Sequence, residues 1–107
     1  MLARPRKQRR SEVNARIRKL HKAIAEKVLA NPDLLHGIEE KLEQRYQSKM
    51  MRYGSYMLWK SILETVNQPD VFKALLLAED ERTANLRRET IFTGVLTEEE
   101  RESALQS

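Results

Sequence analysis

The sequence predicts an all-α protein, a small bundle of four to six helices with a mobile basic N-terminus. Three observations lead to this fold class. The 107 residues include only three glycines and three prolines, and strict apolar alternation over the length of a strand is hard to find. Apolar residues instead recur at helical spacing along most of the chain. The length suits one small domain, which we place at residues 11–107, after a flexible basic segment at residues 1–10.

The first predicted helix follows the basic segment. Residues 1–10 (MLARPRKQRR) offer little to bury, so we expect them to be flexible. Ser11 is a suitable N-cap for a helix that continues to the first Asn-Pro pair. Its apolar stripe has spacings of three and four residues and consists of Val13, Ile17, Leu20, Ile24 and Val28. Because the other faces carry mainly lysine and arginine, this helix is amphipathic and basic at once.

Two proline-aspartate pairs mark the starts of further helices. Asn31-Pro32-Asp33 ends one helix and begins the next, because the residue before proline avoids the α region whereas proline suits a first helical turn. We expect Asn31 to cap this second helix. Gly37 within it either permits close packing or weakens the helix locally. Pro69 begins a fourth helix whose inward residues are expected to be Val71, Phe72, Leu75 and Leu76.

The third predicted helix contains the most apolar segment of the chain. Its stripe is Tyr56, Trp59, Leu63 and Val66. We therefore expect it at the centre of the fold, with most of the aromatic burial. Tyr53, Tyr56 and Trp59 have stacking of nucleic-acid bases as an alternative role. Their aliphatic surroundings favour packing in the core.

The C-terminal third is more polar. Residues 79–90 are highly charged and are expected to be exposed, even where helical. Residues 91–96 (IFTGVL) form a short apolar insert in which Gly94 is suited to a positive φ. Thr97 and Glu100 have the spacing of a capping box and predict the start of a short last helix.

The charges are strongly polarised along the chain. Residues 1–27 carry ten lysines and arginines against two glutamates, a net charge of +8, whereas residues 28–107 have a net charge of −4. A basic start on an acidic body indicates a docking segment for nucleic acid, an acidic protein or a phosphorylated ligand. The alternative is a solvated helix face with no partner.

Catalytic and metal-binding patterns are not found. There is no cysteine, and the three glycines are isolated, so thiol chemistry and a glycine-rich phosphate loop are excluded. His21 and His36 fall on different predicted helices, and we expect both at the surface. No apolar run approaches a membrane span. We therefore expect a cytoplasmic, non-enzymatic protein without cofactor or metal.

Short segments along most of the chain resemble small helical antitoxins of bacterial toxin–antitoxin pairs. The residues that carry the resemblance are Asn31 to Leu35 (NPDLL), Arg52 to Trp59 and Leu86 to Arg101 (LRRETIFTGVLTEEER). The resemblance implies stoichiometric neutralisation of a cognate toxin, and it also implies repression of the protein's own operon through operator DNA. The chain lacks the inhibitory motif of antitoxins against Fic-type enzymes, a helix-turn-helix signature and an N-terminal ribbon strand.

The candidate partner-binding residues come from two segments. Basic residues of the N-terminal segment and the first helix would steer and donate charge-assisted hydrogen bonds to an acidic or phosphate-binding cleft of a partner, while apolar residues supply buried area; the set is Arg9, Arg10, Arg16, Ile17, Arg18, Lys19, Leu20 and Ile24. A second anchor consists of Arg87, Arg88 and Phe92. For Phe92 the alternative is that it folds back to cap the core. Two rival functions use the first helix differently: a nucleic-acid-binding regulator, and an adaptor that forms a homo-oligomer.

Overall fold

Six α-helices make up the described part of the computed structural model, which covers residues 5–106, with side chains described from Arg10 onward. The fold is all-α, as the sequence predicts. The helices are α1 Pro5–Ala30, α2 Leu34–Gln47, α3 Tyr53–Leu63, α4 Pro69–Leu76, α5 Glu81–Arg88 and α6 Glu98–Gln106.

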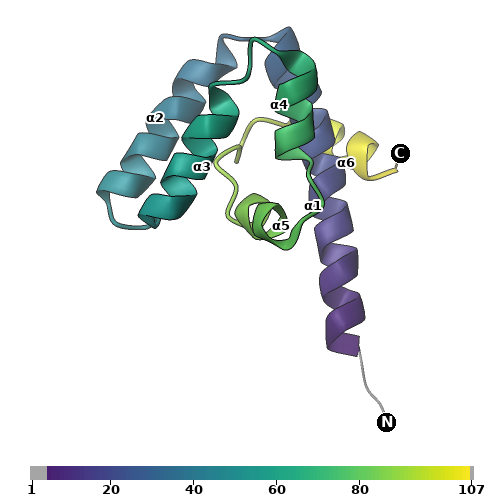
Figure 1. Cartoon of the computed structure of the whole chain (residues 1–107). Coiled ribbons are helices and arrows are strands. Elements are labelled where there is room, and N and C mark those ends of the chain that lie inside the picture. The colour runs from purple at the N-terminus through teal and green to yellow at the C-terminus, as the bar shows by residue number, and fades with distance from the viewer. Residues whose placement is uncertain (1–4, 107) are drawn as a thin grey trace.

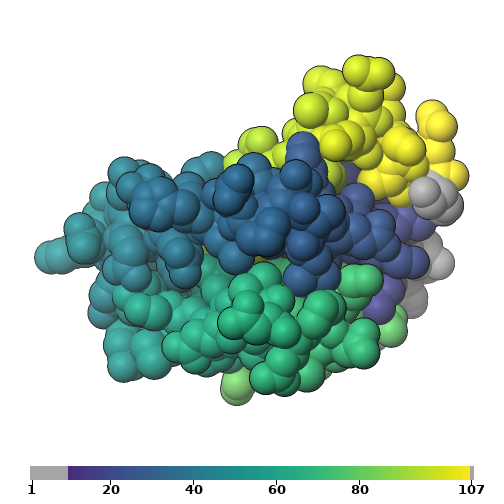
Figure 2. All heavy atoms as spheres, turned by 90° about the horizontal axis from the view of Figure 1, so that it is seen from above, coloured from purple at the N-terminus to yellow at the C-terminus, as the bar shows by residue number. Residues whose placement is uncertain are grey.

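Helix α1 is the central helix of the molecule. It contacts α4, α5 and α6, while α2 pairs with α3, and α3 packs on α4. Figure 1 shows α2 and α3 as an antiparallel hairpin on one side of α1 and α6 on the other, and in Figure 2 α6 stands out from the body. The buried residues of α1 begin only at His21. The N-terminal half of α1 consequently extends beyond the other helices (Figure 1).

The start of α1 differs from the prediction. The helix begins at Pro5, and Ser11 lies within it, so the N-cap assigned to Ser11 is wrong. Arginine, lysine and glutamine are good helix formers, and proline fits the first turn, which explains the longer helix. Of the segment predicted to be flexible, residues 5–10 are part of helix α1, and residues 1–4 lie outside the described part.

The core forms around Trp59, as predicted. Trp59 is fully buried, and its ring meets that of Phe92 edge-on, with the centroids 5.5 Å apart. Helices α1, α2 and α4 also contribute to this cluster; their buried residues include Ile24, Val28, Leu42, Phe72 and Leu76. One apolar cluster thus draws on residues from nearly the whole chain.

Burial differs from the prediction in α4 and in α5. Val71 and Leu75 are 40% and 41% exposed, because the eight-residue α4 buries only the edge that carries Phe72 and Leu76. Residues 79–90 were expected at the surface, yet α5 buries Ala84, Leu86 and Arg87. Because the buried face of α5 is narrow and includes an arginine, the sequence shows no apolar stripe that would predict its burial.

The loops and caps follow the sequence in part. Thr97 N–H donates to Glu100 Oε1 and Glu100 N–H to Thr97 Oγ1, which is the predicted capping box. Gly94 has the expected positive φ of 83°. Asn31 does not cap α2; its side-chain amide donates to the carbonyl of Lys27 at the end of α1. A Cβ added at Gly37 would meet no atom of another element within 4 Å, so close packing does not explain this glycine.

Replacing Phe92 with alanine should lower the free energy of unfolding by about 3–5 kcal/mol, the usual cost of removing a buried aromatic ring. Urea denaturation measures this. Val71→Ala on the exposed edge of α4 is the control and should change the midpoint much less. Equal midpoints for the two variants would contradict the assignment of Phe92 to the core.

Candidate functional site

Two of the predicted binding residues belong to the core. Ile24 is 5% exposed and Phe92 is 2% exposed. Phe92 lies edge-on to both Trp59 and the ring of His21. Of the two roles considered for Phe92, the geometry therefore matches the one in which it closes the core.

Two of the predicted binding arginines donate hydrogen bonds to main-chain carbonyls at the C-terminus of α4. Arg18 Nε donates to the carbonyl of Leu77 over 2.8 Å. The guanidinium of Arg87, which is only 3% exposed, donates to the carbonyls of Leu76 and Ala78, each over 2.8 Å. The last carbonyls of a helix have no partner within it, and the negative end of its dipole favours cations there. Burial, and secondarily the charge of Arg18, lowers the pKa of Arg87.

Three further cations hold the segment between α5 and α6. Arg45 donates to the carbonyl of Thr90 over 2.6 Å, and Lys41 to the carbonyl of Thr93 over 2.9 Å. Lys27 donates to the carbonyl of Val95 and pairs with Glu100 over 2.6 Å, which lowers the pKa of Glu100. These bonds come from α1 and α2. They fix the backbone of the predicted apolar insert against the bundle.

Both histidines are predicted at the surface. His36 is exposed as predicted, but His21 is buried. Its Nδ1 lies 2.8 Å from the carbonyl of Ile17 and its Nε2 lies 2.7 Å from Thr90 Oγ1. Burial, the largest cause, and the charge of Arg87 lower its pKa to about 4. The neutral ring therefore donates a hydrogen bond from Nδ1 to the carbonyl of Ile17, and its Nε2 accepts one from the hydroxyl of Thr90. The Thr90 oxygen in turn accepts a hydrogen bond from the N–H of Phe92. Both ring nitrogens are occupied.

The remaining predicted residues lie at the surface. Arg10, Arg16 and Lys19 are exposed on α1, and Arg88 is exposed at the end of α5. Within residues 10–106, none of these four cations forms an ion pair. Ile17 and Leu20 are half-buried. Arg9 belongs to the backbone of α1, but its side chain lies outside the described set.

A cleft of about 290 Å³ lies where α1, α5, the 90–97 segment and α6 meet. Ile17, Leu20 and Leu96 offer partly exposed apolar surface to it, and Arg88 and Arg101 are the exposed cations on its wall. None of its lining residues is acidic. Arg16, one helical turn before Leu20, extends the positive edge along α1. We call this hollow, together with Arg16, the arginine cleft.

The arginine cleft brings together residues from both predicted segments. The sequence does not predict Arg101, Thr90 and Leu96 as binding residues, because the pattern within one helix does not show which distant segment lies beside it. Their positions depend on how α6 and the 90–97 segment fold back on α1. An apolar floor with guanidinium groups at its edge suits a ligand that is apolar on one side and anionic on the other.

The predicted aromatic set is divided, because Tyr53 and Tyr56 both contact Tyr46 whereas Trp59 lies apart from them. Trp59 is in the core, and Tyr56 stacks on Tyr46 with the ring centroids 4.1 Å apart. Tyr53 is 63% exposed. These three rings therefore do not form a common platform for bases.

No protein-family model, curated protein or solved structure matches this chain. In the described part of the chain, no helix combines the length and apolar character needed to cross a membrane. Nor does any group of three or more histidine, aspartate or glutamate side chains among those residues have a geometry that could hold a metal ion.

Arg18 and Arg16 should differ sharply in their effect on stability. Arg18→Ala leaves the Leu77 carbonyl without its donor and should lower the free energy of unfolding by about 1–3 kcal/mol. Arg16→Ala removes an exposed side chain and should leave it unchanged. Chemical denaturation of the two variants measures the difference, and equal stabilities would show that the bond of Arg18 to α4 contributes nothing.

Acidification should destabilise the protein through His21. The unfolded side chain takes up a proton near its ordinary pKa of 6.5 and the folded one only near 4, so the unfolded state gains protons first as the pH falls. The stability contributed by neutral His21 is complete above pH 6.5 and decreases by about 3 kcal/mol toward pH 4.

Denaturation at pH 7 and at pH 4.5 measures this loss. His21→Asn should show a smaller loss than the wild type, and His36→Asn should retain the wild-type loss because His36 is exposed. The carboxylates contribute to acid sensitivity in all three proteins alike. A loss in His21→Asn as large as that of the wild type would exclude His21 as the cause.

Proposed function

We propose that this protein acts by stoichiometric binding, holding an acidic, amphipathic segment of a partner protein in the arginine cleft. The observation that carries the proposal is the composition of the cleft: partly exposed apolar residues lie beside arginines that form no ion pair within residues 10–106, and no lining residue is acidic. An acidic helix with an apolar stripe supplies both complements. Such an interface gains association rate from charge and affinity from apolar burial.

The proposed roles of the cleft residues follow from their exposure. Arg16, Arg88 and Arg101 would donate charge-assisted hydrogen bonds to partner carboxylates, and Ile17 and Leu20 would supply apolar contact. Arg10 and Lys19 would add long-range attraction. Ile24, Arg87 and Phe92 line the cleft but are buried, and Arg18 is bonded to the carbonyl of Leu77, so these four would shape the cleft and leave partner contacts to the exposed residues.

The antitoxin class is proposed from the resemblance described above. An antitoxin neutralises its toxin by occupying it, and a rigid cleft on a small helical body suits that task. In this proposal the partner is the cognate toxin, and the protein performs no catalysis. The exposed cations of the cleft would attract an acidic segment of the toxin.

A nucleic-acid-binding regulator is the second candidate. It is favoured by Arg10, Arg16 and Lys19, which are exposed and form no ion pair among the described side chains. They lie on the half of α1 that extends beyond the body in Figure 1. A complex based on phosphate contacts loses affinity log-linearly and steeply with salt. A protein complex with an apolar centre loses much less. Self-association through this half of α1 is disfavoured, because it would bring two strongly positive segments together.

Charge reversal at Arg16 separates these candidates. If the cleft holds a partner protein, Arg16→Glu should weaken binding about tenfold or more, about 1.4 kcal/mol, while the thermal stability stays the same. Lys22→Glu is the matched control: it reverses an exposed cation of α1 that is two residues from Leu20, and therefore on another face of the helix, whereas Arg16 is four residues from Leu20 and shares its face. The two variants should be equally impaired if α1 contacts DNA phosphates.

The assay uses the product of the gene adjacent to this one as the partner. Its expression alone should arrest growth, co-expression with this chain should restore growth, and the purified pair should bind with 1:1 stoichiometry by titration calorimetry. Unchanged affinity in Arg16→Glu would overturn the role of the arginine cleft. The absence of any complex would overturn the antitoxin proposal itself.

A further inference from the structure

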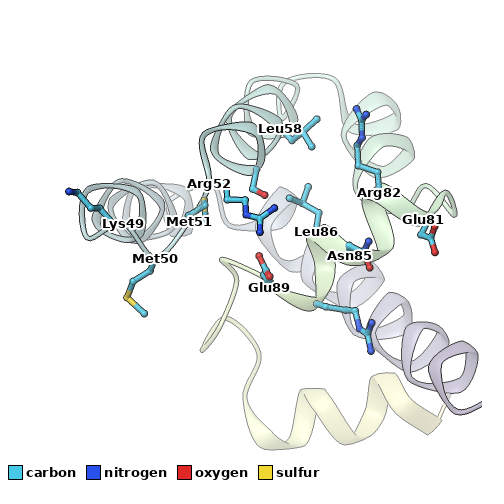
Figure 3. Close-up of a pocket in the computed structure, with 12 residues that line it drawn as sticks. Lys49, Met50, Met51, Arg52, Leu58, Glu81, Arg82, Asn85, Leu86 and Glu89 are labelled. Carbon is cyan, nitrogen blue, oxygen red and sulfur yellow. The ribbon is translucent and has the colours of Figure 1, made fainter. Parts of the chain in front are cut away.

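A second and larger hollow lies on the opposite side of α5 from the arginine cleft. It has a volume of about 960 Å³ and is bounded by the turn between α2 and α3, the first half of α3 and the length of α5. Figure 3 shows Leu58 and Arg52 from the α3 side, Leu86 from α5 and Glu89 just after α5 around the same space. We call it the α3–α5 groove. Arg88 lines both hollows, so the two are neighbours across α5.

The charges around the groove are unbalanced. Four cations line it, Lys49, Arg52, Arg82 and Arg88, against two acids, Glu81 and Glu89. None of the four cations forms an ion pair within residues 10–106, and all four are exposed. The cations therefore outnumber the carboxylates that could neutralise them. This excess attracts an anionic ligand.

The groove also offers apolar surface. Met51 and Leu58 are half-buried in its lining, and Met50 at its edge is 77% exposed. A smaller adjoining hollow shares Arg52, Leu58 and Arg82 with the groove and adds Met57, which is 42% exposed. Methionine adapts to varied apolar partners because its side chain is unbranched and flexible. The apolar strip thus continues along α3.

These features favour a peptide segment over other occupants. A nucleic-acid backbone carries a phosphate at every nucleotide, which Glu81 and Glu89 would repel. A second copy of this chain that docked through the same groove would place one cationic edge against another. A protein segment can alternate carboxylates with apolar residues, so it can match the arginines, avoid the two glutamates and cover the methionines.

We infer that the α3–α5 groove is a second docking site, which binds an acidic peptide segment with apolar anchors. The inference rests on the proposed function in one respect: the segment belongs to the same partner that occupies the arginine cleft. The partner would then cross α5 at Arg88. Two clefts joined across one short helix would give a larger contact area than either alone.

The test uses a fluorescein-labelled synthetic peptide with leucines at helical spacing and glutamates elsewhere, with binding measured by fluorescence anisotropy. The double variant Arg52→Glu/Arg82→Glu should weaken binding at least tenfold, and Met50→Ser should weaken it several-fold. All three positions are exposed, so the melting temperatures should equal that of the wild type. Lys22→Glu, which lines neither hollow, should bind as the wild type does.

The variant of the arginine cleft keeps this inference separate from the proposed function. If Arg16→Glu alone weakens peptide binding, the arginine cleft is the site and the groove inference is overturned. If the groove variants weaken it and Arg16→Glu does not, the groove is supported without the cleft. Weakening by both sets supports a single segment that crosses α5.

Three other outcomes would also overturn the groove inference. One is the absence of saturable peptide binding, and another is an equal loss in Lys22→Glu, which would indicate non-specific attraction. The third is a different occupant. It would show as tighter binding of duplex DNA with the same dependence on Arg52 and Arg82, or as a concentration-dependent dimer in sedimentation that the double variant abolishes.

Discussion

The arrangement of this protein depends on basic side chains that donate to main-chain carbonyls at the ends of helices and in the 89–97 segment. Arg18 and Arg87 converge on the last carbonyls of α4, while Lys27, Lys41 and Arg45 hold the segment between α5 and α6. These carbonyls have no partner within a helix, and burying them unpaired would cost free energy. The bonds join segments distant in the sequence, so they determine where the arginine cleft forms.

Positive charge consequently has two separate uses in this chain. One set of cations stabilises the fold by donating hydrogen bonds to main-chain carbonyls that have no backbone donor. The other set, which includes Arg16 on α1, Arg88 on α5 and Arg101 on α6, stays exposed and without ion pairs in the described region. Only this second set is available to a partner. Net charge alone therefore overstates the surface that α1 offers for docking.

The base of the arginine cleft is rigid because one polar chain is built into the core beside Phe92. The neutral ring of His21 links the carbonyl of Ile17 to the hydroxyl of Thr90, and that hydroxyl accepts the N–H of Phe92. Phe92 in turn lies against Trp59. The partly exposed apolar residues at the surface are thus supported by a fully packed layer. A preformed surface of this kind loses less conformational entropy on binding than a flexible one.

The sequence by itself determined the all-α class, the start of α4 at Pro69, the Thr97–Glu100 capping box and the central place of Trp59, because these depend on local spacing and backbone preference. Only the tertiary structure decided which cations are structural, that His21 and Arg87 are buried, and that α5 packs inward. Periodicity identifies an apolar face, but it does not reveal which carbonyls of another element lack a partner: Arg18 and Leu77 are 59 positions apart. The candidate site was therefore predicted in its exposed residues of α1 and α5, and missed where a distant segment folds back to complete it.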